Sequence, residues 1–316
     1  MSPFHLHPAA PGDIPRIMAL QLENQRLHPQ AEVVSEEMLL SPGYGGGKYI
    51  ICAVDNTGKL AGYIPIGADL VLEKGVPHLV WANMKIAQGI VNPGTLRDLL
   101  LEQAVKLVNE LTAGAPGHGT RLMFQYHVSE VENIDYVLSR GAVFMDSVMR
   151  MTCDLADEPV PVPTPPGIDV RYWKMETEAE QRAYVAARNE AFPHMPVTLS
   201  DWQHSLRTEI GNTGTSVGAF DGAKVTGCVS VYWDDAENRL YGKAAGWTED
   251  IFVREAWRGR GVADCMISKA LVYLKTHGLK EAQLDTGISN QRAIHVYKRM
   301  GYKIVDESRQ YCIMLT

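Results

Sequence analysis

A glycine- and arginine-rich run separates a short apolar segment from an amphipathic one. The run consists of Arg258, Gly259, Arg260, Gly261, Val262 and Ala263. Glycine lets the backbone turn and approach a ligand closely, because it has no Cβ. A helix that begins after the run would offer unpaired N–H groups and a positive dipole end to an anion, and guanidinium groups suit phosphate oxygens. The run is therefore a candidate diphosphate site, although the same residue types also form ordinary surface turns.

A second group of candidate residues lies further along the chain. Asn290 suits the N-cap of a helix, because its side chain can accept a backbone N–H bond. Ala293 and Tyr297 stand at positions i and i+4, so they share one helix face, and Gly301 suits the left-handed position that ends a helix. A small residue beside a tyrosine leaves room for a narrow ligand with the phenol at its end. The alternative is a core tyrosine whose hydroxyl reaches solvent.

Strands and helices must position these residues, and the sequence predicts the same order of elements in both halves. Each half opens with a short strand and continues with a helical segment. Each half then has two apolar runs separated by turn residues, which is the pattern of a β-hairpin. The strands are expected at 4–7 and 168–172, and the hairpins at 49–64 and 216–231. Because Ala53 matches Ala219 and Gly62 matches Gly227 with only one residue of slip, the pattern indicates an internal duplication.

After each hairpin, strands alternate with helices. The long helix expected at 262–275 places apolar residues on one face at helical spacing. These residues are Val262, Met266, Ala270, Leu271 and Leu274. Such alternation predicts an α/β (α+β) fold in which helices flank a mixed, mostly antiparallel sheet.

A proline-rich stretch in the middle of the chain marks the expected domain boundary. Prolines at 159, 161, 163, 165 and 166 favour an extended, semi-rigid conformation that suits neither a helix nor a sheet interior. We therefore expect a first domain at 1–155, a linker at 156–166 and a second domain at 167–316. The alternative is a long proline-rich loop within one domain.

Composition excludes several classes of protein. The 316 residues suit two domains, and 46% hydrophobic residues can fill two cores. A formal charge of −7 argues against a nucleic-acid partner and favours a cationic small molecule. We expect no membrane partner, because no apolar run is long enough for a membrane span. Without a charged-then-apolar segment at the N-terminus, we also expect a cytoplasmic protein. We expect it to be a monomer or a homodimer.

No metal site or disulfide framework is expected. The five cysteines are scattered and form no C-x-x-C pair, and the histidines form no H-x-x-x-H pattern. The cysteines are Cys52, Cys153, Cys228, Cys265 and Cys312. The segment 43–48 is glycine-rich like a phosphate loop, but Pro42 and Tyr49 replace the glycine and the hydroxyl residue that such a loop needs, so we expect a flexible loop.

Together the two candidate groups resemble the GNAT superfamily of acyl-coenzyme A-dependent N-acyltransferases. The run matches R/Q-x-x-G-x-G/A, and residues 290–302 match N-x-x-A-x-x-x-Y-x-x-x-G-F/Y. The resemblance covers about 167–316 and implies two tandem GNAT-like domains. It implies that the run Arg258 to Ala263 binds the diphosphate of acetyl-CoA. It also implies that the strand residues Ile251, Phe252 and Val253, together with Asn290 and Ala293, lie along the pantetheine arm.

The resemblance also implies a reaction, the direct transfer of an acetyl group to a primary amine. An alkyl amine is mostly protonated near neutral pH, so a base must remove a proton before it attacks. Glu249 stands where many family members carry that base, and Asp250 is its alternative. The alternative to a catalytic role is that Glu249 and Asp250 are two solvated carboxylates at the end of a strand. Tyr297 would protonate the departing thiolate, and N–H groups near Ile251 and Phe252 would stabilise the oxyanion.

The acceptor is expected to be a small-molecule amine. Residues before the second hairpin stand where the family usually binds acceptors, although they can equally be packing and capping residues. They are Asn189, Glu190, Phe192 and Trp202. Tandem members that resemble this chain in length include mycothiol synthases, which implies a cysteinyl aminosugar as an alternative acceptor.

The first half lacks the corresponding motif residues. Val137 stands at the tyrosine position and Glu130 at the asparagine position, so we expect no acyl transfer from this half. Two further alternatives remain open for the whole chain. One is a non-catalytic acyl-CoA sensor, and the other is a transferase that uses aminoacyl-tRNA, which the acidic balance disfavours.

Overall fold

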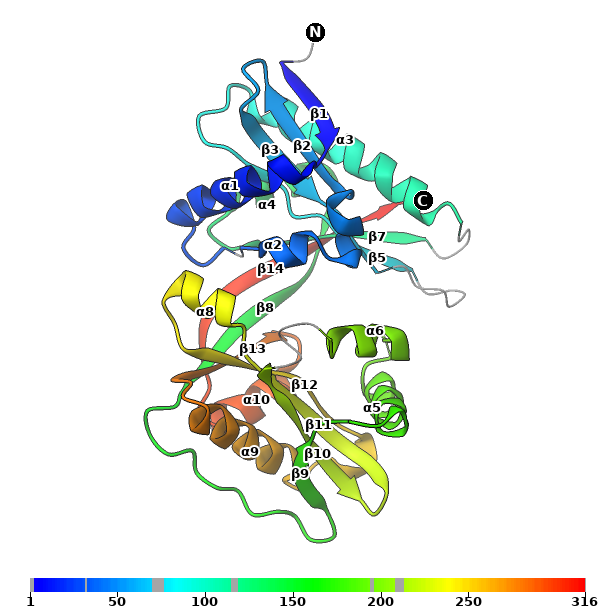
Figure 1. Cartoon of the computed structure of the whole chain (residues 1–316), viewed down its shortest axis with the longest axis vertical. Coiled ribbons are helices and arrows are strands. Elements are labelled where there is room, and N and C mark those ends of the chain that lie inside the picture. Colours follow the sequence, from blue (N-terminus) through cyan, green and yellow to red (C-terminus); the bar gives the residue numbers. More distant parts are fainter. Residues whose placement is uncertain are drawn as a thin grey trace. The chain divides into compact units, whose positions relative to one another are not determined.

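The computed structural model of the chain describes residues 3–31, 33–69, 77–114, 119–193, 196–207 and 213–315. The chain divides into two compact units (Figure 1). The first contains Met1–Val148 and Glu307–Thr316, and the second contains Met149–Asp306. Each unit combines strands with flanking helices, so the predicted α/β class with a mixed, mostly antiparallel sheet is confirmed.

The first unit has strands in the orders β1-β2-β3-β6 and β4-β5-β7-β14, where β14 is Lys303–Leu315. The hairpin β2–β3 is antiparallel, whereas β5 and β7 are parallel. Its elements are β1 (Phe4–Pro8), η1 (Pro11–Asp13), α1 (Ile14–Leu27), α2 (Glu36–Leu39), η2 (Pro42–Gly47), β2 (Ile50–Asp55), β3 (Leu60–Pro65), β4 (Gly67–Asp69), β5 (His78–Trp81), β6 (Lys85–Ile86), α3 (Pro93–Thr112), β7 (Thr120–His127) and α4 (Val131–Ser139).

The second unit has the strand order β8-β13-β12-β11-β10-β9. Its elements are β9 (Asp169–Trp173), α5 (Glu178–Ala191), α6 (Leu199–Ser205), β10 (Thr215–Asp221), β11 (Lys224–Tyr232), α8 (Asp235–Tyr241), β12 (Ala245–Val253), η3 (Glu255–Trp257), α9 (Val262–Thr276), β13 (Glu281–Gly287) and α10 (Gln291–Arg299). Two strands, β8 (Val143–Asp154) and β14 (Lys303–Leu315), contain residues of both units. The helix expected at 262–275 is confirmed within one residue, and all five of its predicted apolar residues are buried.

The two hairpins have the same register, which supports the predicted duplication. Ala53 pairs with Gly62 in the first unit, and Ala219 pairs with Gly227 in the second. In both hairpins the register shifts immediately after the alanine. The same residue types therefore occupy the same bulged position of each hairpin.

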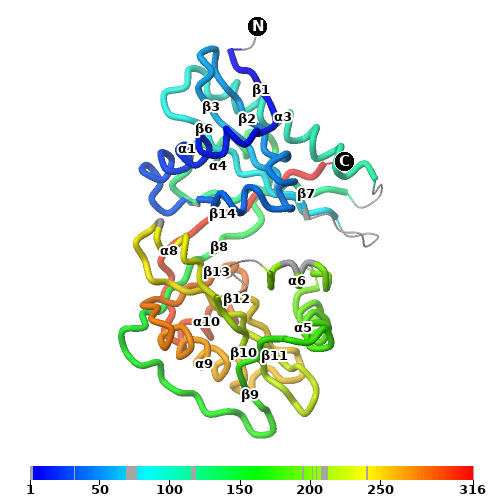
Figure 2. Tube along the Cα trace, viewed as in Figure 1, coloured from blue at the N-terminus to red at the C-terminus, as the bar shows by residue number. Residues whose placement is uncertain are grey.

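Each unit buries apolar side chains on both faces of its sheet. In the second unit, α9 packs against Val229 and Val231 on one face of the sheet. On the other face, α5 packs in a separate cluster with Cys228 and Phe252. The trace in Figure 2 shows α9 and α5 on either side of β10 and β11. The first unit likewise has one cluster with α3 and another with α1. The side chains of successive strand residues thus point into the cores on opposite faces of the sheet, as the pleat requires.

The domain boundaries expected from the proline-rich stretch are wrong. Residues 307–316 belong to the first unit because residues 308–315 of β14 pair with β7. Residues 149–155 belong to the second unit, whose core includes Met149 and Met151. The stretch 156–166 is not a linker between units but packs along α9, where the hydroxyl of Ser268 donates to the carbonyl of Val160 at 2.9 Å.

The glycine-rich segment 43–48, expected to be a flexible loop, lies largely within η2, a short 3₁₀ element that is interrupted by non-helical residues at Tyr44, Gly45 and Gly46. Gly45, Gly46 and Gly47 all have positive φ angles. A Cβ at Gly45 would lie 2.8 Å from the ring of Tyr49, so glycine is needed there for close packing. Among the described residues, no helix is long and apolar enough to cross a membrane.

Candidate functional site

Strand β12 contains a bulge at the predicted catalytic carboxylates. Cys228 of β11 pairs with Phe252, whereas Ser230 pairs with Glu249, so β12 accommodates one extra residue between these pairs. Asp250 lies within the bulge and has a φ of 46°. A left-handed conformation at a residue other than glycine is strained, and it persists where neighbouring contacts enforce it.

Glu249 is a partly buried carboxylate with a raised pKa. Its Oε2 accepts a hydrogen bond of 2.7 Å from the hydroxyl of Tyr232. Burial raises the pKa of Glu249 to about 6, and the carboxylates of Asp250 and Asp285 act in the same direction. The hydrogen bond from Tyr232 and the charge of Arg150 lower the pKa without cancelling the effect of burial.

Asp250 has different partners from its neighbour. Its Oδ2 accepts hydrogen bonds from the Tyr184 hydroxyl at 2.8 Å and from Nε of Arg188 at 3.1 Å. Both partners belong to α5, whereas the partner of Glu249 belongs to β11. The two carboxylates therefore separate, as the alternation of a strand predicts, and Asp250 ties the bulge to α5.

The edge of β12 that carries the expected pantetheine contacts is open. β12 pairs with β13 only over Ala245–Trp247, against Glu281–Gln283. From Thr248 onward this edge of β12, including the predicted Ile251, Phe252 and Val253, pairs with no described strand. Backbone groups on this edge that make no bond within the chain are consequently available to an extended ligand, whereas the carbonyl of Val253 already accepts from Arg258.

The glycine- and arginine-rich run leads from the end of β12 into α9. Gly259 and Gly261 have φ angles of 75° and 79°, and Gly261 is the N-cap of α9. A Cβ at either glycine would meet nothing within 4 Å, so backbone conformation and not crowding favours glycine there. The Nε of Arg258 donates to the carbonyl of Val253 at 2.9 Å, which fixes this side chain beside the strand end. Arg260 is exposed, Val262 is buried in the core and Ala263 is half-buried.

Helix α10 begins and ends as the sequence predicts. The Oδ1 of Asn290 accepts the N–H of Ala293 at 3.3 Å, and Gly301 follows the helix with a φ of 94°. Tyr297 is only 7% exposed, and burial raises the pKa of its phenol to about 12. The hydroxyl of Tyr297 makes no hydrogen bond to another described residue, so its proton is available to a ligand.

A hydrogen bond connects the segment after α10 to β12. The hydroxyl groups of Tyr302 and Thr248 are 2.8 Å apart, and both residues are buried. Thr248 directly precedes Glu249, and the ring of Tyr302 lies 6.1 Å from that of Tyr297. The bond thus links the elements that carry the predicted base and the predicted acid.

The four predicted acceptor residues all have contacts within the chain. Asn189 exchanges two hydrogen bonds of 2.9 Å with the backbone of Val197, and Glu190 forms an ion pair with Arg254. The ring of Phe192 packs edge-on against Phe252 at 6.0 Å, and Trp202 lies 4.2 Å from the ring of Tyr184. Phe192 therefore adjoins Phe252, which follows the bulge, and Trp202 adjoins Tyr184, which bonds to Asp250.

Sequence reasoning missed the partners of the two carboxylates. Tyr232, Tyr184 and Arg188 lie far from Glu249 and Asp250 in the sequence, and their own spacing matches no motif. Arg150 and Asp285 were missed for the same reason, although their ion pair acts on the pKa of Glu249. The pairing of strands and the packing of α5 against the sheet bring them together.

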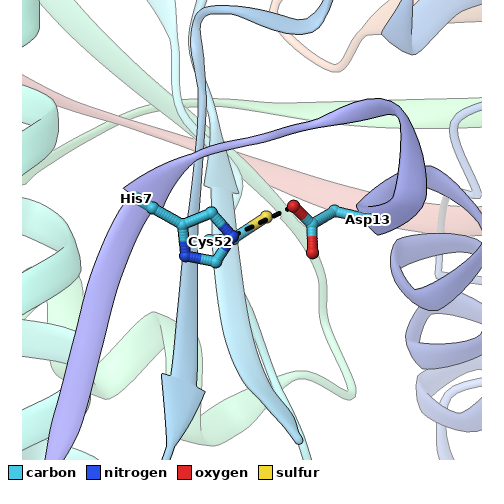
Figure 3. A group of neighbouring side chains, drawn as sticks. All are labelled: His7, Asp13 and Cys52. Atoms are coloured by element: carbon cyan, nitrogen blue, oxygen red, sulfur yellow. Dashed lines mark hydrogen bonds and ion pairs between the residues drawn. The ribbon is translucent and has the colours of Figure 1, made fainter. Parts of the chain in front are cut away.

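A separate group of possible metal ligands lies in the first unit, where none was expected. His7, Asp13 and Cys52 offer ligand atoms within 4.8 Å of one another (Figure 3). Asp13 already accepts bonds from His7 Nε2, the Ala10 N–H and Arg16, and burial raises the pKa of Cys52 to about 12. Because the carboxylate already accepts three hydrogen bonds and burial favours the protonated thiol, we interpret the group as a hydrogen-bonded cluster at the start of α1.

In the first unit, side chains fill the position that corresponds to the open edge of β12. Lys85 pairs with Tyr63 as Phe252 pairs with Cys228. The Nζ of Lys85 lies 2.6 Å from Oε1 of Glu130, and both side chains are less than 10% exposed. Glu130 is the N-cap of α4, as Asn290 is of α10.

Backbone N–H groups beside Lys85 and on strand β7 are also hydrogen-bonded to side chains. The N–H of Met84 donates to the hydroxyl of Tyr126 at 3.2 Å, and the N–H of Gln125 donates to Asn83 at 2.8 Å. The cavity lined by Lys85, Asn83 and Glu130 has a volume of only about 40 Å³. The strand edge that is open in the second unit is thus closed in the first.

Comparisons with known proteins agree with this geometry. Residues 171–302 match the model of the acetyltransferase (GNAT) family. The chain is 24% identical over 312 residues to a mycothiol acetyltransferase of Actinosynnema mirum, covering 98% of this chain and 97% of that protein. A second mycothiol acetyltransferase, of Cellulomonas flavigena, is 26% identical over 229 residues, which cover 70% of this chain and 63% of that protein.

Solved structures show the same fold. A GCN5-related N-acetyltransferase from Sphaerobacter thermophilus has a TM-score of 0.79 at 19% identity, covering 99% of this chain and 96% of that one. A tandem GNAT protein from the clavulanic acid biosynthesis pathway has a TM-score of 0.72 at 14% identity and covers 98% of each chain. The family match over residues 171–302 shows that the second unit carries an acetyltransferase (GNAT) domain, and the relative that matches along its full length and the solved tandem GNAT structure are consistent with a chain of the tandem GNAT type.

Proposed function

We propose that the second unit transfers the acetyl group of acetyl-CoA to the primary amine of a small molecule. The observation that carries the proposal is Glu249, a partly buried carboxylate with a pKa of about 6 on the bulged strand that leads into the glycine- and arginine-rich run. Such a carboxylate is mostly ionised at neutral pH and is still basic enough to accept a proton. Glu249 is the proposed general base and Tyr297 the proposed general acid.

The proposed donor site follows the open edge of β12. The backbone of Arg258 to Ala263 and the N-terminus of α9 would bind the diphosphate. Ile251, Phe252 and Val253 would bond to the pantetheine arm, which Asn290 and Ala293 would flank on α10. The positive φ angles of Gly259 and Gly261 support this assignment, because they let the backbone turn directly into the N-terminus of α9.

In the proposed reaction, Glu249 accepts a proton from the ammonium group, directly or through water. The nitrogen lone pair then forms a bond to the acetyl carbonyl carbon, and N–H groups near Ile251 and Phe252 stabilise the oxyanion. The carbon–sulfur bond breaks as the oxyanion collapses, and the thiolate takes the phenolic proton of Tyr297. The second proton of the amine nitrogen then passes through solvent to the phenolate, which restores Tyr297, and Glu249 releases its proton to solvent. Burial raises the pKa of the Tyr297 phenol to about 12, so the phenol keeps its proton until the thiolate forms.

The acceptor is proposed to approach as a cation. The carboxylates of Asp250 and Asp285 both act on Glu249, and a protonated amine would reduce their mutual repulsion. Phe192 and Trp202, beside the aromatic residues at the bulge, with Asn189 and Glu190 on α5, are proposed to shape the acceptor site. A cysteinyl aminosugar is the second candidate, favoured by the full-length similarity to a mycothiol acetyltransferase.

The test measures thiol release from acetyl-CoA with polyamines, amino acids, aminosugars, aminoglycosides and a cysteinyl aminosugar. We expect at least one amine to be acetylated, with losses of about 100-fold or more for Glu249→Gln and for Tyr297→Phe. Selective use of the cysteinyl aminosugar would support the second candidate. Binding of acetyl-CoA without thiol release for any amine would instead indicate a sensor, and the proposal would then be wrong.

A further inference from the structure

Tyr232 is placed to control the proposed base. It pairs across the strands with Trp247, so Glu249 is its diagonal neighbour on the same face of β12. The phenol donates to Oε2 of Glu249 at 2.7 Å, within the range of a charge-assisted hydrogen bond. Tyr232 belongs to β11 and lies outside every motif that identifies the family.

Toward an ionised Glu249, the phenol of Tyr232 acts as a hydrogen-bond donor. Burial, followed by the charge of Glu249, raises the pKa of Tyr232 well above its usual value. Tyr232 therefore stays protonated across the range in which Glu249 titrates. A donor that keeps its proton favours the carboxylate over the neutral carboxylic acid.

The other groups around Glu249 act in opposing directions. Asp250 beside it and Asp285 on β13 disfavour its charge, whereas Arg150 on β8 favours it. The charge of Glu237 on α8 helps to raise the pKa of Tyr232, and its carboxylate accepts a hydrogen bond from the Trp247 indole. Arg150 also forms an ion pair with Asp285, so its positive charge is shared between Asp285 and Glu249. Tyr232 is thus the direct hydrogen-bond donor that opposes burial and two neighbouring carboxylates.

We propose that Tyr232 is a positioning residue that holds Glu249 ionised and in one orientation toward the acceptor amine. The inference rests on the proposed role of Glu249 as general base. Without the phenol, Glu249 would remain partly buried beside two like charges and would keep its proton to a higher pH. Orientation would also loosen, because no other hydrogen bond to Glu249 is found among the described residues.

The experiment measures kcat/KM against pH for wild type and for Tyr232→Phe on one amine, so that the titration of the substrate cancels. We expect the acidic limb to move upward by about one pH unit, because a donor to an ionised group is lost. A second variant replaces Tyr232 alone with a fluorinated tyrosine, whose phenol is a stronger donor of the same shape. That variant should move the limb downward.

Tyr172→Phe is the matched control. Its phenol also donates one hydrogen bond in the second unit, to the carbonyl of Lys269 at 3.2 Å, but it lies apart from the proposed site. Its pH profile should match that of wild type. A purely structural role for Tyr232 would lower activity equally at all pH values.

The outcomes distinguish the two proposals. If Glu249→Gln retains activity and the acidic limb, the proposed function of Glu249 fails. If Glu249→Gln is inactive but neither Tyr232 variant moves the limb, the base stands and the role of Tyr232 is wrong. Opposite shifts for the two Tyr232 variants would support both.

Discussion

At the scale of single residues, Gly261 offers a sharp test of the phosphate-binding run. Gly261→Ala should lower the free energy of unfolding by about 1 kcal/mol, because an L-residue is disfavoured at a φ of 79°. It should also raise the KM for acetyl-CoA by about tenfold, because the N-terminus of α9 would shift from the diphosphate. Thermal unfolding and steady-state kinetics measure the two effects separately.

Gly278→Ala is the control for this substitution. Gly278 follows the other end of α9 with a φ of 87°, and a Cβ there also meets nothing within 4 Å. Both variants should lose similar stability, but only Gly261→Ala should weaken acetyl-CoA binding. Equal KM values for the two variants would contradict a phosphate site at Gly261.

At the scale of elements, the contact between α5 and β12 maintains the bulge. Arg188→Met should destabilise the chain by about 2 kcal/mol, because it leaves the partly buried carboxylate of Asp250 without its cation. It should also lower kcat, because Asp250 can then relax from its left-handed conformation and displace Glu249. Chemical unfolding and kcat measurements test this prediction.

Arg182→Met on the same helix separates this effect from a general loss of charge. Arg182 pairs with Glu178, and both side chains are more than half exposed. Such a pair contributes about 0.5 kcal/mol or less, so kcat should not change. If Arg188→Met behaves like Arg182→Met, the link between α5 and the bulge has no role in catalysis.

At the scale of the whole molecule, sequence patterns predict the structural features that depend on residues close together in the chain. The hairpins, the helix expected at 262–275 and the cap at Asn290 depend on local spacing, and the structure confirms them. The unit boundary depends on the pairing of β14 with β7, which no local pattern encodes, and its prediction failed. The hydrogen bond between Tyr232 and Glu249 was missed for the same reason.

The duplicated fold predicts one acetyl-CoA site per chain and not two. In the first unit, Lys85 and Glu130 form a buried ion pair at the positions of Phe252 and Asn290, and the Tyr126 hydroxyl occupies a backbone donor. Opening that space would strip two charges of their partners, at a cost of several kcal/mol. Acetyl-CoA would have to provide this energy before gaining any contact of its own.

Calorimetric titration with acetyl-CoA should therefore give a stoichiometry of about one per chain. Gly261→Ala should weaken that single binding event by about tenfold, because the run belongs to the second unit. Lys85→Met with Glu130→Gln removes both charges together and should leave the stoichiometry at one, since the first unit also lacks the glycine- and arginine-rich run. A second binding event in wild type that survives Gly261→Ala would show that the first unit also binds the donor.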